Sequence, residues 1–528
     1  MRLSPLWAAA LAAGLSLQSS PLLAQTTPSV EDELRKEIQE LHQRLEQLEK
    51  KLDQQSQSGR PAPAAPVQPA EAPLPADRER ALQQRVDDLD QQVRVLGRKQ
   101  ELDQEEKAAE KKERATVTAG EKGLEVKSAD GQNVFRLRGV LQADERFFLG
   151  ESIGTDTFLL RKVRPIFEGT LGGIYDFKFV PDFGGGKTVV QDAYVNARFK
   201  PYANVIVGKM KQPIGLERLQ LDVDTRFVER AFPTDVAPNR DIGIDLHGAL
   251  FNKTLEYDVG LFNGSLDGGS SDGFTPEQDN NGDKDWAARL FARPFRSTLS
   301  PLQGLGLGLA VSISDASGSS PATGTATTQQ TNLPTYITPA QLTFFNYRNT
   351  GPSATFASGE RIRWSPQGYW YYGSLGLLAE YILEQQDVSR NLSATLTRKN
   401  QLTNSAWQVQ LTYLLTGEEE SFDGVKPSRP FRLGGPGWGA FELAARYSEL
   451  SIDDGAFAGG ASSYADPRAS AGAAREWSAG LNWYLNWNVK LQLDYSRTRF
   501  NGGGGGTLTA PKDRVDEQLI FGRIQLGF

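Results

Sequence analysis

The sequence predicts an all-β fold, an antiparallel transmembrane β-barrel of about sixteen strands with an inward constriction loop, preceded by an N-terminal α-helical coiled coil. Two observations carry this prediction. From about Gly120 to the end of the chain, apolar and polar residues alternate with a period of two, as β-strands require. Beyond the N-terminal segment, no stretch approaches about 18 consecutive apolar residues, so a closed barrel is the expected means of crossing a membrane.

Residues 1–24 are expected to be a secretory signal peptide. Arg2 supplies the positive start, Leu6–Leu17 forms the apolar centre, and Ala24 fits the cleavage position, although Leu22 departs from the preference for small residues there. A single transmembrane helix is the alternative. Because the apolar run is short and no stop-transfer pattern follows it, we favour the signal peptide.

Two helical segments with narrow apolar seams follow at residues 25–58 and 78–118, joined by a Pro- and Ala-rich linker at 59–77. Apolar positions in the first are spaced alternately by four and three residues: Leu34, Ile38, Leu41, Leu45, Leu48 and Leu52. The second repeats this spacing from Leu82 to Leu96. The helices either fold back on each other or form a parallel coiled coil between subunits, and the narrow seam favours the second interpretation.

Residues 119–528 form the predicted barrel domain. In the segment around Ser405–Leu415, Trp407, Val409 and Leu411 face one way, whereas the intervening glutamines face the other. Aromatic residues gather at strand ends, as in Trp370–Tyr372, which is typical of the girdles at the two membrane interfaces. The final segment is amphipathic and has Phe528 at its end, which resembles the assembly signal of bacterial outer-membrane proteins.

The connections between the expected strands alternate in length. Tight turns at Asn252–Thr254 and Tyr484–Asn488 contrast with long segments rich in Gly, Ser and Asp, such as Ser314–Gly359 and Asp453–Arg475. Short periplasmic turns and long external loops produce this asymmetry in membrane barrels.

The stretch from Thr188 to Arg240 is expected to contain the constriction. Two strands are predicted first, and their polar faces are expected to carry Val190, Asp192, Tyr194, Asn196 and Arg198, and then Val205, Val207, Lys209 and Lys211. The run Leu216–Arg240 then mixes acids and bases, among them Arg218, Arg226 and Arg230. A loop of about 25 residues with little regular pattern is usually functional, and we expect this one to fold into the barrel and narrow a pore.

Basic side chains on the predicted polar faces indicate anion preference, since a narrow, low-dielectric pore focuses their field. The candidate pore-lining and anion-binding residues are Arg161, Lys162, Arg164, Asp192, Arg198, Lys209, Lys211, Arg218, Arg226 and Arg230. The alternative for each base is that it pairs with an acid of the barrel lumen and only holds the wall together.

Composition narrows the remaining function classes. The formal net charge of −7 does not suggest a nucleic-acid binder, and the absence of cysteine excludes disulfides and thiolate sites. With His42 and His247 as the two histidines, neither a metal cluster nor a catalytic triad is expected, so we predict no enzyme and no cofactor. Asp279–Asp285 loosely resembles a calcium loop but lacks its distal glutamate, which favours a solvated loop tip.

Several stretches match a known family in order and spacing: Gly139–Asp144, Arg161–Gly169, Asp176–Phe179, Gln191–Tyr194, Gly208–Arg218, Phe227–Ala231, Trp286–Leu290 and Gly376–Tyr381. Through them, residues 139–528 resemble the phosphate- and polyphosphate-selective porins, the porins O and P. The resemblance implies a sixteen-stranded trimeric porin of the bacterial outer membrane that steers anions through a basic eyelet. It also implies that Arg161, Lys162, Asp192 and Arg218 lie around the constriction.

One departure from this family affects the expected selectivity. Its best-known members add arginines to the pore from a later inward loop, whereas Ser297–Tyr347 contains no Lys or Arg. The sequence therefore favours a general or differently selective anion porin over one with high phosphate specificity.

We expect a passive, anion-preferring channel for small anionic solutes, with phosphate-type anions among the candidates, embedded as a homotrimer in outer-membrane lipid with its N-terminal helices in the periplasm. The alternative is a structural barrel with little solute selectivity, which the coiled coil tethers to the cell wall.

Overall fold

The structure is a computed structural model that describes residues 84, 87–88, 90–102, 104 and 114–528, except 151–153, 187 and 266–281. The chain divides into two compact units, Met1–Lys99 and Gln100–Phe528. In the first unit the described residues are helical, and Arg94 forms an i,i+4 ion pair of 2.7 Å with Asp90. The expected signal peptide, first coiled-coil helix and linker lie outside the described residues, as do residues 279–281 of the loop Asp279–Asp285.

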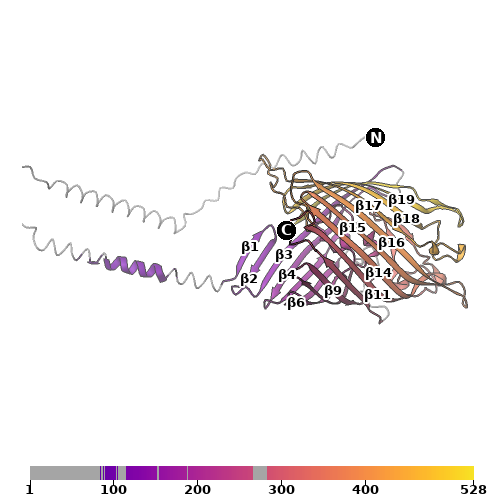
Figure 1. Cartoon of the computed structure of the whole chain (residues 1–528), viewed down its shortest axis with the longest axis horizontal. Helices are drawn as coiled ribbons and strands as arrows, with labels where there is room; N and C mark the ends of the chain where they lie inside the picture. Colours follow the sequence, from indigo (N-terminus) through magenta and orange to yellow (C-terminus); the bar gives the residue numbers. More distant parts are fainter. Residues whose placement is uncertain are drawn as a thin grey trace, which may run out of the picture. The chain divides into compact units, whose positions relative to one another are not determined.

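The second unit is a closed antiparallel barrel (Figure 1). Sixteen of its described strands pair in chain order, and the last closes on the first through a register that runs from Leu519 opposite Phe148 to Gly527 opposite Val140. The strands are β3 (Val134–Phe148), β4 (Thr157–Leu171), β5 (Tyr175–Asp182), β6 (Val189–Lys200), β7 (Ala203–Lys211), β8 (Arg240–Leu250), β9 (Leu255–Phe262), β10 (Asp285–Ala292), β11 (Gly304–Ser317), β14 (Thr355–Tyr372), β15 (Leu375–Asn391), β16 (Thr397–Leu414), β17 (Ala440–Ser451), β18 (Ala471–Tyr484), β19 (Val489–Gly506) and β21 (Glu517–Gly527). The predicted sixteen-stranded barrel is confirmed.

The strands turn their apolar side chains outward and their polar side chains inward, which is the reverse of a water-soluble β-barrel. In β16, Val409, Leu411 and Tyr413 are 39%, 47% and 51% exposed, whereas Gln410 and Thr412 are buried. Successive side chains of a strand point to opposite faces. The apolar row therefore forms the outer surface of the barrel and the polar row its interior, as expected from the sequence.

Three connections send side chains into the barrel interior. The first, Gln212–Asn239 between β7 and β8, contains α4 (Leu216–Leu219) and α5 (Pro233–Val236). The second joins β11 to β14 and contains α6 (Thr328–Thr331), β12 (Thr335–Ile337), β13 (Thr343–Asn346) and η3 (Gly351–Ser353). The third joins β16 to β17. We call them the first, second and third inward segments; the sequence predicted only the first.

The second inward segment packs against the first through aromatic side chains. The rings of Phe232 and Phe344 lie 5.8 Å apart, and both belong to one buried apolar cluster. Tyr336 donates a hydrogen bond of 3.0 Å to Glu384 on the inner face of β15. Up to Tyr347 this segment contains no Lys or Arg, which accords with a packing role for its aromatic residues.

The third inward segment is long although it lies at the end of the barrel that also has the tight turns. It reaches as far as the first inward segment, where the side-chain amide of Gln220 donates a hydrogen bond of 2.7 Å to the Phe422 carbonyl. The Phe422 ring stacks 5.2 Å from Tyr369 on β14. The expected rule of short turns at one end thus fails at this connection.

Six short elements extend the sheet or the loops beyond the barrel strands. β1 (Thr116–Gly120) and β2 (Gly123–Lys127) form a hairpin that starts before the expected barrel boundary at residue 119, and β2 pairs with β3. β20 (Pro511–Asp513) pairs with the end of β19. Three 3₁₀ turns complete the described loops: η1 (Gly184–Gly186), η4 (Asp454–Ala456) and η5 (Gly460–Ser462). No helix among the described residues is long and apolar enough to span a membrane.

The predicted polar face of β6 is wrong at Val190. The register between β5 and β6 shifts around Gln191, where a bulge makes Gln191 and Asp192 both buried while Val190 is 37% exposed. A bulge adds one residue and so exchanges the faces on either side of it.

The predicted polar face of β7 is wrong in the same way at Val207. Val207 is 49% exposed and lies opposite Val195 and Ile244, which belong to the outer apolar row. Between Val207 and the two lysines lies Gly208 with φ 130°, a conformation that favours glycine and distorts the pleat. Beyond it, the Lys211 ammonium bonds inward, to the carbonyls of Leu219 and Gln220 at 3.4 and 3.0 Å.

Candidate functional site

A cavity lies inside the barrel where β4 and the first two inward segments meet. Its lining residues are Arg161, Lys162, Arg164, Arg218, Asp222, Thr225, Val228, Glu229, Arg230, Thr234, Asp235, Asn239, Arg240, Ile337, Thr338, Pro339 and Gln341. We call the six basic residues among them the basic cluster: Arg161, Lys162, Arg164, Arg218, Arg230 and Arg240. The lining carries three acids, Asp222, Glu229 and Asp235, so bases outnumber acids among the described residues around this cavity.

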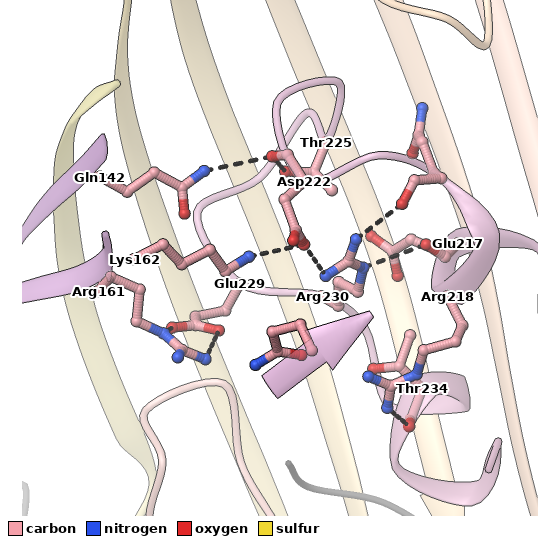
Figure 2. Close-up of polar contacts among 12 residues, drawn as sticks. Gln142, Arg161, Lys162, Glu217, Arg218, Asp222, Thr225, Glu229, Arg230 and Thr234 are labelled. Atoms are coloured by element: carbon pink, nitrogen blue, oxygen red, sulfur yellow. Dashed lines mark hydrogen bonds and ion pairs between the residues drawn. The ribbon is translucent and has the colours of Figure 1, made fainter. Parts of the chain in front are cut away.

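Asp222 is the centre of the cluster (Figure 2). Its carboxylate lies 2.6 Å from the Lys162 ammonium, 2.6 Å from Arg230 Nη1 and in contact with Arg164 Nη1. Burial alone would raise the pKa of Asp222, but Lys162, Arg230 and Arg164 together hold that pKa well below its usual range. One carboxylate therefore contacts three basic side chains.

Glu229 holds a second group of bases. Arg161 donates to it from Nε and Nη2 at 2.9 and 3.2 Å, and Arg146 on β3 donates from Nη2 at 2.9 Å. Such forked contacts fix the plane of a guanidinium. Burial opposes ionisation of Glu229, yet Arg161 and Arg146 lower its pKa. Two arginines thus share one carboxylate.

The other members of the basic cluster are positioned mainly by backbone carbonyls and by a neighbouring strand. Arg218 donates from Nη2 to the Thr234 carbonyl, and Arg230 donates to the carbonyls of Glu217 and Gln220 at 3.1 and 3.0 Å. Arg240 donates 2.6 Å to Asp192 on β6. Because carbonyls bind a cation without neutralising it, the carbonyl contacts of Arg218 and Arg230 orient these side chains without cancelling their charge.

The first inward segment is anchored by acids of two further strands: β15, on the wall opposite β4, and β19, which is separated from β4 by β21 and β3. Glu380 accepts the backbone N–H groups of Leu216 and Glu217 at 2.5 and 3.3 Å. Asp494 accepts the N–H of Val228 at 2.6 Å. The segment therefore crosses the barrel from β4 to β15, with basic residues toward β4 and backbone donors toward Glu380 and Asp494.

Arg226 contributes to this anchoring rather than to the cavity. Its guanidinium is buried between Glu442, 2.8 Å from Nε, and Glu420 of the third inward segment, which it contacts through Nη2. Nη2 also donates 2.6 Å to the Ser421 carbonyl. This contact links the first inward segment to the third.

The structure brings together five of the ten candidate residues around the cavity: Arg161, Lys162, Arg164, Arg218 and Arg230. Two more adjoin this group. Asp192 accepts a hydrogen bond from the cavity-lining Arg240, and Lys211 donates to the carbonyls of Leu219 and Gln220 at the end of α4. Lys209 is buried on β7 and does not line the cavity. Arg198 lies at the end of β6, where it forms a half-exposed ion pair of 2.8 Å with Asp176.

Sequence reasoning missed the partners that organise the cluster, chiefly Asp222, Glu229 and Arg240. The acids were visible in the loop, but alternating charges in a loop do not reveal which acid meets which base. Arg240 was the last residue of the predicted loop and instead begins β8.

Residues 135–526 match the family described as phosphate-selective porins O and P. The chain belongs to this family. Among curated proteins, this porin is 27% identical to Porin O of Pseudomonas aeruginosa over 143 residues, which cover 26% of this chain and 29% of that protein. The match to that relative thus spans less than a third of its length.

Solved structures of similar architecture include three outer-membrane proteins. The DcaP channel of Acinetobacter baumannii has a TM-score of 0.44 at 10% identity, covering 76% of this chain and 99% of that one. OmpF of Salmonella typhi has a TM-score of 0.44 at 12% identity, covering 75% and 98%. OmpT of Vibrio cholerae in its trimer form has a TM-score of 0.43 at 10% identity, covering 75% and 99%.

Membership of the family makes this chain an outer-membrane porin. The resemblance seen in the sequence is confirmed. The outer apolar rows of the barrel are accordingly its lipid-facing surface, and the cavity lies in its lumen.

Proposed function

We propose that this porin is a passive, anion-preferring channel whose selectivity is set by the basic cluster. The single observation that carries the proposal is the excess of bases over acids around the cavity. Two like charges about 4 Å apart interact by roughly 1 kcal/mol in water and roughly 4 kcal/mol at an effective dielectric constant of 20. A permeating cation would meet this repulsion, whereas an anion would be attracted.

Small phosphate-type anions are the solutes that the site fits best. Arginine forks match the geometry of phosphate oxygens, and the family is described as phosphate-selective. However, the second inward segment lines the cavity with Ile337, Thr338, Pro339 and Gln341, which carry no charge. We therefore propose a moderate rather than a strict preference for phosphate.

The zero-current potential of the wild-type channel in a KCl gradient tests this function. We expect its sign to be that of a chloride-preferring pore, because the local field at the cluster outweighs the acidic balance of the whole chain. Millimolar phosphate added to the same bilayer should reduce the chloride current by competing for the cluster. A cation-preferring potential would refute the proposal.

We further propose that the porin is a homotrimer whose N-terminal helices lie in the periplasm as a parallel coiled coil. The support is the heptad seam at Leu34–Leu52 and Leu82–Leu96 together with the family membership. Because the chain has no cysteine, Leu45→Cys introduces a single thiol at a seam position.

Under oxidation in membranes, full-length Leu45→Cys should form disulfide-linked dimers within trimers, since equivalent seam residues of parallel helices face one another. A matched thiol at Gln43, outside the seam, should cross-link far less. Equal cross-linking at both positions, or none at either, would contradict the parallel arrangement.

A further inference from the structure

The outer wall of β18 and β19 carries three arginines next to its aromatic residues. In β18, Trp477 is 64% exposed while Glu476 and Ser478 are buried, so Trp477 faces outward. Arg475 lies two residues before Trp477 in the same strand and therefore also faces outward. In β19, Tyr495 is 40% exposed, and Arg497 and Arg499 share its face. These arginines therefore lie on the outer surface of the barrel and take no part in the lumen.

The register places them in one compact block. Arg475 lies directly opposite Glu449 on β17 and directly opposite Arg499 on β19. One step along the strands, Trp477 lies between Tyr447 and Arg497, and the rings of Tyr447 and Trp477 are 4.5 Å apart. We call Arg475, Arg497 and Arg499 the outer arginine triad.

The charges of the triad are only partly balanced. Glu449 pairs with Arg475 at 2.9 Å, and Asp516 pairs with Arg497 and Arg499 at 2.7 and 3.5 Å. Three guanidinium groups thus meet two carboxylates. Their side chains remain 52%, 40% and 63% exposed. Like charges directly opposite on neighbouring strands are destabilising, so an anion placed between Arg475 and Arg499 would relieve their repulsion.

The position of the triad identifies the source of that anion. The triad lies at the end of the barrel with the long connections, just beyond the Trp477 level, while Leu481 and Leu493 continue the apolar surface below. Aromatic girdles mark the boundary between acyl chains and head groups. A group bound here would have acyl chains beside the apolar rows and phosphate beside the arginines.

We propose that the outer arginine triad binds the phosphate groups of a phosphorylated glycolipid of the outer leaflet, with its acyl chains against Trp477, Leu481 and Leu493. The ligand is a lipid head group rather than free phosphate because the arginines adjoin an exposed apolar wall. This lipid contact is separate from solute passage, since none of the three arginines enters the lumen.

The experiment measures lipid binding by the purified full-length porin in detergent with native mass spectrometry. The probes are lipid A with both phosphates and the same lipid without phosphates. We expect wild type to bind the phosphorylated lipid about tenfold more tightly, as a few charge-assisted hydrogen bonds would give. Arg475→Gln/Arg499→Gln should abolish that preference and leave single-channel conductance unchanged.

Two further variants make the result specific. Arg468→Gln removes an arginine at the same end of the barrel that is 48% exposed and paired with Asp466, and it should bind like wild type. Arg475→Lys/Arg499→Lys retains the charge, and its affinity for the phosphorylated lipid should fall about threefold because lysine lacks the planar fork. If the glutamine variant does not fold, this lysine variant tests the proposal in its place.

Three outcomes would overturn the proposal. The first is an unchanged preference for phosphorylated lipid in the folded double variants. The second is equal competition by inorganic phosphate at the lipid's concentration, which would indicate a free-phosphate site. The third is efficient disulfide cross-linking of Arg475→Cys between copies in membranes, which would make this face a subunit interface.

Discussion

Replacing Lys162 and Arg230 together by glutamine is expected to lower the anion-to-cation permeability ratio of the channel by about tenfold. Both side chains lie 2.6 Å from the Asp222 carboxylate, and both line the cavity. Their removal leaves Asp222 with Arg164, so the local excess of positive charge falls by two. Tenfold corresponds to about 1.4 kcal/mol, which is at the low end of what two charges contribute in a narrow pore.

The measurement is the zero-current potential in a KCl gradient, with Arg198→Gln as the matched control. Arg198 was a candidate on the same sequence grounds, but its side chain is 48% exposed and paired with Asp176 at the end of β6. Its replacement should leave the permeability ratio unchanged. An equal shift in both variants would show that charge anywhere in the barrel sets selectivity, and no shift in either would remove the basic cluster from the mechanism.

The barrel itself was predictable because a membrane imposes one rule on every strand. Each lipid-facing residue must be apolar, so Val409, Leu411 and Tyr413 alternate with polar neighbours in a pattern that the sequence displays directly. The rule fails where the backbone leaves the regular pleat. At Gln191 a bulge exchanges the faces, and at Gly208 a positive φ distorts the pleat. Neither feature has a distinct signature in a single sequence.

The candidate site was predictable in its residue types and less so in its geometry. Arg161, Lys162 and Arg164 were found from strand periodicity and resemblance, and Arg218 and Arg230 from the charged loop. Their convergence on Asp222 and Glu229 depends on contacts between segments tens of residues apart, which local patterns do not encode. The same reason hid the role of Arg226, whose partners are about 200 positions away in the chain.

Replacing Arg226 by methionine is expected to destabilise the barrel by about 3–5 kcal/mol, because it leaves two carboxylates buried without their cation. Arg226, Glu420 and Glu442 have side-chain exposures of 2%, 0% and 0%. The same change releases the first inward segment from the third, so single-channel currents should also become noisier. Urea unfolding in lipid vesicles, followed by tryptophan fluorescence, measures the stability.

The partner variants separate lost packing from an uncompensated buried charge. Arg226→Met/Glu420→Gln/Glu442→Gln removes all three charges and should regain most of the stability, since a buried ion pair replaced as a unit costs little. Arg136→Met breaks the half-exposed ion pair with Glu125 and should change stability by less than about 1 kcal/mol. If the triple variant were as unstable as Arg226→Met alone, packing around the arginine stem would be the cause. If Arg226→Met were as stable as Arg136→Met, the constriction would be held without this contact.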